Sequence, residues 1–175
     1  REGPAGPHRG AAARGEDGSK LLSDPNWKAL FFNDHQNQTL IALGDVIIPS
    51  TDTPGATAAL VNRFIDLLLS VQPAEFQRQF VESLDYIDSQ SQKQYGREFL
   101  AVSKQDQQDL LIPWAYPRSP DFWMEQQEKP DPGEQHFARL KSAIAAAFYG
   151  SEVGEKELGW QGEFTNGVYQ GCEAE

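Results

Sequence analysis

Two amphipathic helical segments between Phe31 and Leu69 constrain the fold of this chain more than any other feature of its sequence. Asn33 or Asp34 can cap the first helix, and Pro49 stops it, because proline cannot continue a helix without losing a hydrogen bond. One face of this helix is apolar and carries Leu40, Leu43 and Ile47. A face of this kind must pack against another element.

The second helical segment follows an elbow at Pro54 and Gly55, and Thr57 is a candidate cap for it. Its apolar residues repeat at i, i+3, i+4 and i+7, which predicts that they form one buried face: Val61, Phe64, Ile65 and Leu68. The whole stretch carries packing signals and no catalytic motif. Such a sequence is more typical of a scaffold or subunit than of a catalyst.

A third helix is predicted from Pro73 to about Ser89, followed by a polar turn over residues 90–96. Its apolar face carries Phe76, Phe80, Leu84 and Ile87. Ser103 and Asp106 have the spacing of a capping box, which opens a short helix that Pro113 ends.

The clearest helical pattern begins at Asp131, a candidate cap, with Pro132 at the first helical position and Glu134 able to close a capping box. Its apolar stripe consists of Phe137, Leu140, Ile144 and Phe148. Gly150 stops this helix, and Ser151 can cap a last short one. We therefore predict an all-α protein, an irregular bundle of five or six helices over residues 29–158. An extended or disordered N-terminal arm covers residues 1–28, and an extended tail covers residues 159–175.

An aromatic loop, Trp114–Gly133, follows the short helix that Pro113 ends and leads into the helix that begins at Asp131. It has many prolines and no clear hydrophobic period. We predict that it is ordered, with a short helix near Phe122–Gln127, because loops of this length are usually functional or disordered and this one is too apolar for disorder. Two alternatives stay open. The loop packs against its own helical core, or it forms a partner surface, where Trp, Tyr and Arg concentrate.

The net charge of −11, from 26 acidic and 15 basic side chains, argues against binding to nucleic acid or to an anionic membrane surface. No apolar run approaches the roughly 20 residues of a membrane span. Residues 1–20 are rich in Gly, Ala and Arg and lack the apolar core of a signal peptide. We interpret them as an arm, or as what remains after processing.

No pattern for catalysis or for cofactor binding emerges. His8, His35 and His136 lack metal-ligand spacing to each other and to Cys172. The sequence has no phosphate-binding glycine loop after a strand, no nucleophile motif and no haem-attachment motif. We assign no catalytic, cofactor-binding or metal-binding residue.

Three segments of the chain resemble the gluconate 2-dehydrogenase subunit 3 family. They are Phe31–Phe32 leading into LIALGDVIIPSTDTPGA, then VNRFIDLLLS, and finally HFARLKSAIAAAFYGSEVGEKELGW followed by YQGC. Their order and spacing are those of the family, and together they span about Phe31 to Cys172. The stretch PWAYPRSPDFWMEQQEKPDPG between them has no family pattern.

The resemblance implies a non-catalytic small subunit of an FAD-dependent dehydrogenase in the bacterial cell envelope or periplasm. Its partner would be a large subunit of the glucose–methanol–choline oxidoreductase type, which holds the FAD and oxidises a sugar or sugar acid. Electrons would then pass to a c-type cytochrome subunit or another acceptor. The small subunit would support folding, stability and export of the flavoprotein and would hold no cofactor itself.

Cys172 is the only cysteine, so it is either free or bonded to another chain. The oxidising compartment that the resemblance implies favours a disulfide with the large subunit. Six aromatic residues are candidates for the partner interface: Trp114, Tyr116, Trp123, Tyr149, Trp160 and Tyr169. The main alternative is a stand-alone helical binding protein of the envelope that uses the aromatic loop as its ligand site. An enzyme acting on sugars is a third alternative, which the missing catalytic pattern disfavours.

Overall fold

The computed structural model describes residues 21–116 and 131–159. Within these ranges it contains six complete α-helices, one 3-10 turn and no strand, which confirms the prediction of an all-α fold. The elements are α2 (Asp34–Ile47), α3 (Val61–Ser70), α4 (Ala74–Tyr95), η1 (Phe99–Ala101), α5 (Lys104–Ala115), α6 (Pro132–Tyr149) and α7 (Glu152–Glu157).

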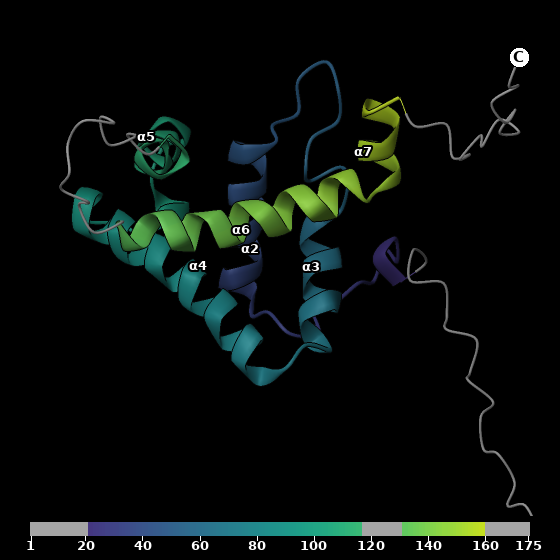
Figure 1. Cartoon of the computed structure of the whole chain (residues 1–175), viewed down its shortest axis with the longest axis horizontal. Helices are drawn as coiled ribbons and strands as arrows, with labels where there is room; N and C mark the ends of the chain where they lie inside the picture. The colour runs from purple at the N-terminus through teal and green to yellow at the C-terminus, as the bar shows by residue number, and fades with distance from the viewer. Residues whose placement is uncertain (1–20, 117–130, 160–175) are drawn as a thin grey trace, which may run out of the picture.

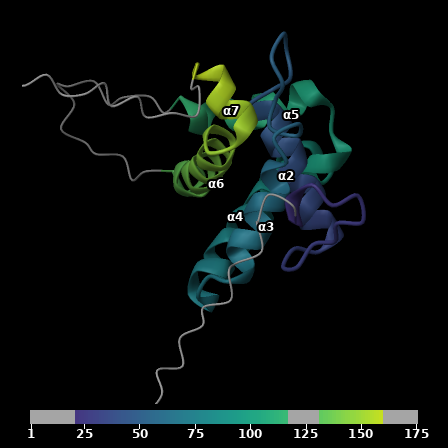
Figure 2. The ribbon, with the colours of Figure 1, turned by 90° about the vertical axis from the view of Figure 1, so that its right-hand side faces the viewer.

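Helix α6 lies across α2, α3 and α4 and contacts all three, as well as α5 and α7 (Figure 1). Seen from the side, α6 and α7 lie on one side of this layer, and residues 21–33 lie on the other (Figure 2). The apolar stripe predicted for α6 faces the layer and is fully or almost fully buried. The core therefore lies between α6 and the three helices beneath it.

Four helices begin at the caps that the sequence predicts: Asn33, Ser103, Asp131 and Ser151. Each of these side chains accepts a hydrogen bond from a backbone N–H two or three residues further along the chain. Asn33 and Ser103 complete capping boxes. Such caps satisfy backbone donors that the first turn of a helix leaves without a partner.

The predicted start of α3 is wrong. Thr57 does not cap this helix, and its hydroxyl donates to Asp45 Oδ1 at 2.6 Å. The helix begins at Val61, after Leu60 in a left-handed conformation with φ of 55° and no side-chain cap. A non-glycine residue in this region costs on the order of 1–3 kcal/mol.

The predicted buried face of α3 is wrong in part. Val61 and Ile65 are buried as expected, but Phe64 and Leu68 are 41% and 39% exposed. Their place in the interior is taken by Leu69 and by two polar side chains, Asn62 and Asp66. These polar residues are buried because both have hydrogen-bond partners.

Two helix ends also differ from prediction. Helix α4 runs to Tyr95 instead of ending near Ser89, and Gly96, with φ of 70°, ends it. Helix α5 continues through Pro113 to Ala115, although proline has no N–H to donate to the carbonyl of Asp109. On α4, three residues of the predicted face are buried, but Phe76 in the first turn is 45% exposed.

Candidate functional site

A buried carboxylate on α3 holds the segment before α2, which we call the N-terminal strap (residues 21–33). Asp66 has no exposed surface and accepts three hydrogen bonds from consecutive backbone N–H groups. The donors are Leu30 N at 2.7 Å, Phe31 N at 3.0 Å and Phe32 N at 2.9 Å. Hydrogen bonds to an ionised acceptor are stronger than neutral ones, so this contact fixes the strap against α3.

Arg63, one turn before Asp66, binds the same strap. Its Nη1 donates to the carbonyls of Leu22 at 2.7 Å and Asp24 at 3.0 Å. Its guanidinium carbon also lies 5.1 Å from the ring centroid of Trp27, a cation–π distance. Both charged side chains of α3 are therefore engaged inside the chain.

Sequence patterns did not single out Asp66 or Arg63. A signal was present, because Asp66 follows Ile65 and precedes Leu69 by three residues, which places it beside core positions of the same helix. A buried carboxylate at such a position needs hydrogen-bond donors, but the sequence does not show which residues provide them.

A polar network joins α4 to α6 through Ser83. This buried hydroxyl donates to Gln79 O at 2.8 Å and contacts His136 Nδ1 at 3.1 Å. Arg139 Nη1 donates to it at 2.8 Å. Burial lowers the pKa of His136 below its ordinary 6.5, and the neighbouring Arg139 charge lowers it further. His136 therefore joins α6 to α4 through its contact with Ser83.

Trp114, a candidate partner contact, lies at the junction of α5, α4 and α6. Its Nε1 donates to Asp131 Oδ2 at 3.1 Å, and its ring centroid lies 5.8 Å from that of Tyr86. Gly133 is packed against the indole, since a Cβ atom there would lie 2.1 Å from Nε1. Trp114 thus packs on the chain's own core, and whether its exposed part also contacts a partner stays a prediction.

The other aromatic candidates fall into two groups. Tyr116, at the end of α5, is 78% exposed, and Tyr149, at the end of α6, is 45% exposed. The structure does not bring these two or Trp114 into a single ring cluster. The remaining candidates lie outside the residues that the structure describes, as does Cys172: Trp123, Trp160 and Tyr169. The same holds for most of the aromatic loop.

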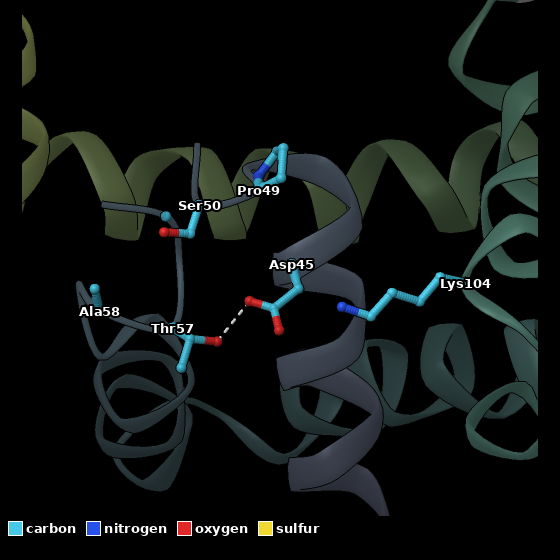
Figure 3. Close-up of a pocket in the computed structure, with 7 residues that line it drawn as sticks. Asp45, Pro49, Ser50, Thr57, Ala58 and Lys104 are labelled. Carbon is cyan, nitrogen blue, oxygen red and sulfur yellow. Dashed lines mark hydrogen bonds between the residues drawn. The ribbon is translucent and has the colours of Figure 1, made fainter. Parts of the chain in front are cut away.

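A groove lies beside the second half of α2. One hollow of about 390 Å³ is lined by Asp45, Thr57 and Lys104 together with residues of the loop between α2 and α3 (Figure 3). A second hollow of about 320 Å³ shares Asp45 and Lys104 and continues towards η1. The Thr57 hydroxyl donates to Asp45, and the Lys104 side chain points from α5 towards α2. The groove offers hydrogen-bonding groups and one charge of each sign.

A second charged contact ties the start of α2 to α4. His35 Nε2 lies 2.6 Å from Asp88 Oδ2, and Asp88 Oδ1 accepts a hydrogen bond from Phe99 N at 3.0 Å. The hydrogen bond to Asp88 raises the pKa of His35 above 6.5, against the opposing effect of burial. Glu98 and Asp85 add smaller effects in the same direction. This is a stabilising ion pair in the protonated form of the imidazole.

Over residues 21–116 and 131–159, no group of three or more His, Cys, Asp or Glu side chains could hold a metal ion. No helix in these ranges is both long enough and apolar enough to cross a bilayer.

These features define an all-α protein whose buried polar networks hold its own helices together. Comparison with known protein families assigns this all-α chain to one of them. The family model of gluconate 2-dehydrogenase subunit 3 matches residues 34–167, and the chain belongs to this family. No curated protein and no solved structure matches the chain. The protein is therefore a subunit of the gluconate 2-dehydrogenase kind, and its partners are dehydrogenase chains.

Proposed function

We propose that this chain is the non-catalytic small subunit of an FAD-dependent dehydrogenase and supports the folding, stability and export of the flavoprotein subunit. The observation that carries the proposal is the match of residues 34–167 to a dehydrogenase subunit family. The networks around Asp66 and Ser83 support it, because they use the buried polar groups of the described chain for packing.

In this proposal the large subunit is of the glucose–methanol–choline oxidoreductase type, holds the FAD and oxidises a sugar or sugar acid. A c-type cytochrome subunit or another acceptor takes the electrons. The complex works in the periplasm or at the cell envelope. The small subunit binds no cofactor of its own and contributes no reacting group.

The test is co-expression of the flavoprotein subunit with and without this chain. The proposal expects active, FAD-loaded flavoprotein in the envelope only when the small subunit is present, and degraded or cytoplasmic flavoprotein when it is absent. Normal amounts of active flavoprotein in the envelope without the small subunit would reject the supporting role.

A second measurement tests the division of labour. The two chains of the purified complex are separated, and the visible spectrum of each is recorded. We expect the flavin band to stay with the large chain. Stoichiometric flavin, iron or haem in the small chain would reject a cofactor-free subunit.

A further inference from the structure

The strap leaves α3 with an outward face that carries no charge. The core takes Val61, Ile65 and Leu69, and the strap takes Arg63 and Asp66, which are the only charged residues of this helix. At 100° per residue, Asn62 and Ser70 fall on the core and strap sides of the helix, and the sector between Arg63 and Val61 is entirely apolar. It consists of Leu60, Phe64, Leu67, Leu68 and Val71, which we call the outward face of α3.

This face is open to solvent. Phe64 and Leu68 are about two-fifths exposed, and Val71 at the end of the helix is 76% exposed. The spacing of i, i+4 and i+7 places these three side chains on one side of the helix. Phe76, which follows in the first turn of α4, is exposed to a similar degree. Four large apolar side chains within 13 positions of an acidic chain are therefore left in water.

The surroundings of α3 limit what can cover this face. The N-terminal strap lies on one side of α3, and α6 with α7 lies on the other (Figure 2). Among the described residues, neither of these neighbours buries Phe64 or Val71.

We infer that the outward face of α3 is the apolar centre of the surface on which the dehydrogenase subunit docks; this rests on the proposed function. The family places the chain in an assembly with dehydrogenase chains, so a partner is present in the native complex. Charge argues against a second copy as the occupant, because it would bring a further net charge of −11 to this one. An apolar surface with a basic rim complements both the uncharged face and the acidic chain.

The exposed area fits the centre of an interface and not the whole of it. An aromatic side chain presents about 150–250 Å², so Phe64 and Phe76 together leave roughly 130–220 Å² in water. A stable interface needs about 800 Å² from each partner. The contact must therefore extend beyond α3, over a more polar rim such as the exposed Glu75 on α4.

The test uses the full chain co-expressed with a tagged dehydrogenase subunit. Phe64→Glu and Leu68→Glu place a charge at the centre of the proposed contact, and each should weaken association at least tenfold in Kd. Leu100→Glu is the matched control, because Leu100 in η1 is an apolar residue of similar exposure, 37%, and is not among the candidate partner contacts. This control should bind as the wild type does.

Two further readouts keep the result unambiguous. Thermal unfolding of each variant shows whether it folds. A photo-crosslinking phenylalanine analogue in place of Phe64 reports the occupant without adding a charge. A crosslink to the dehydrogenase subunit supports the inference. A crosslink to a second copy or to the chain's own residues 160–175 overturns it, as does wild-type affinity of both glutamate variants.

The same binding experiment separates an error in the docking surface from an error in the proposed function. If the wild-type chain binds and supports the flavoprotein and both glutamate variants do so equally well, the function stands and the docking surface is wrong. If the wild-type chain itself neither binds nor supports the flavoprotein, the proposed function is wrong and the inference falls with it.

Discussion

Replacing Asp66 by alanine should destabilise the folded chain by about 3–5 kcal/mol. The carboxylate accepts three backbone hydrogen bonds, and a hydrogen bond to a charged group contributes about 1.5–3 kcal/mol. Leu30 is 68% exposed, so water can replace the lost partner of its N–H, and this bond counts little. The N–H of Phe32 belongs to a residue that is only 5% exposed, and it would be left without an acceptor. Against a total stability of about 5–15 kcal/mol, this loss is large.

The measurement is urea unfolding followed by circular dichroism, together with hydrogen exchange of the amides of residues 30–32. At about 2–4 °C per kcal/mol for a chain of this size, the midpoint of thermal unfolding should fall by roughly 6–20 °C. Asp109→Ala is the control, because Asp109 is an exposed carboxylate on α5 whose hydrogen bond among the described residues comes from its neighbour Gln105. It should change stability by less than about 0.5 kcal/mol. A loss below about 1 kcal/mol for Asp66→Ala, with unchanged exchange of the strap amides, would refute the reasoning.

Three other changes have defined outcomes. The hydrogen bond to Asp88 raises the folded-state pKa of His35, so its stabilisation is complete below about pH 6.5 and is lost as the pH rises through the raised value. The difference in unfolding free energy between wild type and His35→Gln should shrink over that window in urea titrations at several pH values, and a constant difference contradicts this. Gly133→Ala should cost about 1–3 kcal/mol and alter tryptophan fluorescence, because the new methyl group displaces Trp114; an unchanged thermal midpoint argues against the packing. We also expect Cys172 to be bonded to the large subunit. A non-reducing gel of the native complex should then show a band at the summed mass that reductant abolishes and Cys172→Ser lacks, whereas two separate bands reject the bond.

The helix starts that the sequence predicts are those decided by short-range contacts. Asn33, Ser103, Asp131 and Ser151 each find their backbone donor within three residues, so the cap is visible without the fold. Thr57 has the same chemistry, but the helix begins four residues later, after Leu60 in a left-handed conformation without a side-chain cap. The hydroxyl of Thr57 instead donates to Asp45, twelve positions earlier, a contact that depends on tertiary structure.

The candidate site was less predictable than the fold for the same reason. Trp114 packs on the chain's own core, which was one of the two alternatives, and its role as a partner contact stays a prediction. The strap contacts of Arg63 and Asp66 join residues more than 30 positions apart. No periodicity in the sequence indicates such contacts. The apolar spacing of α3 instead predicted a buried face that includes Phe64 and Leu68.

The magnitudes show why α3 turns a different face inwards. With Phe64 and Leu68 in the core, Asp66 would point to solvent and its three hydrogen bonds to the strap would be lost. Full burial of a Phe or Leu side chain contributes about 1.5–3 kcal/mol, so leaving two-fifths of each exposed costs on the order of 1 kcal/mol per residue. The bonds to Asp66 contribute more than this sum. The observed orientation is therefore the stable one for the isolated chain, although it leaves apolar side chains in water. A partner that covers the outward face of α3 would recover that remaining cost without disturbing Asp66, so docking and the strap stabilise the same orientation of the helix.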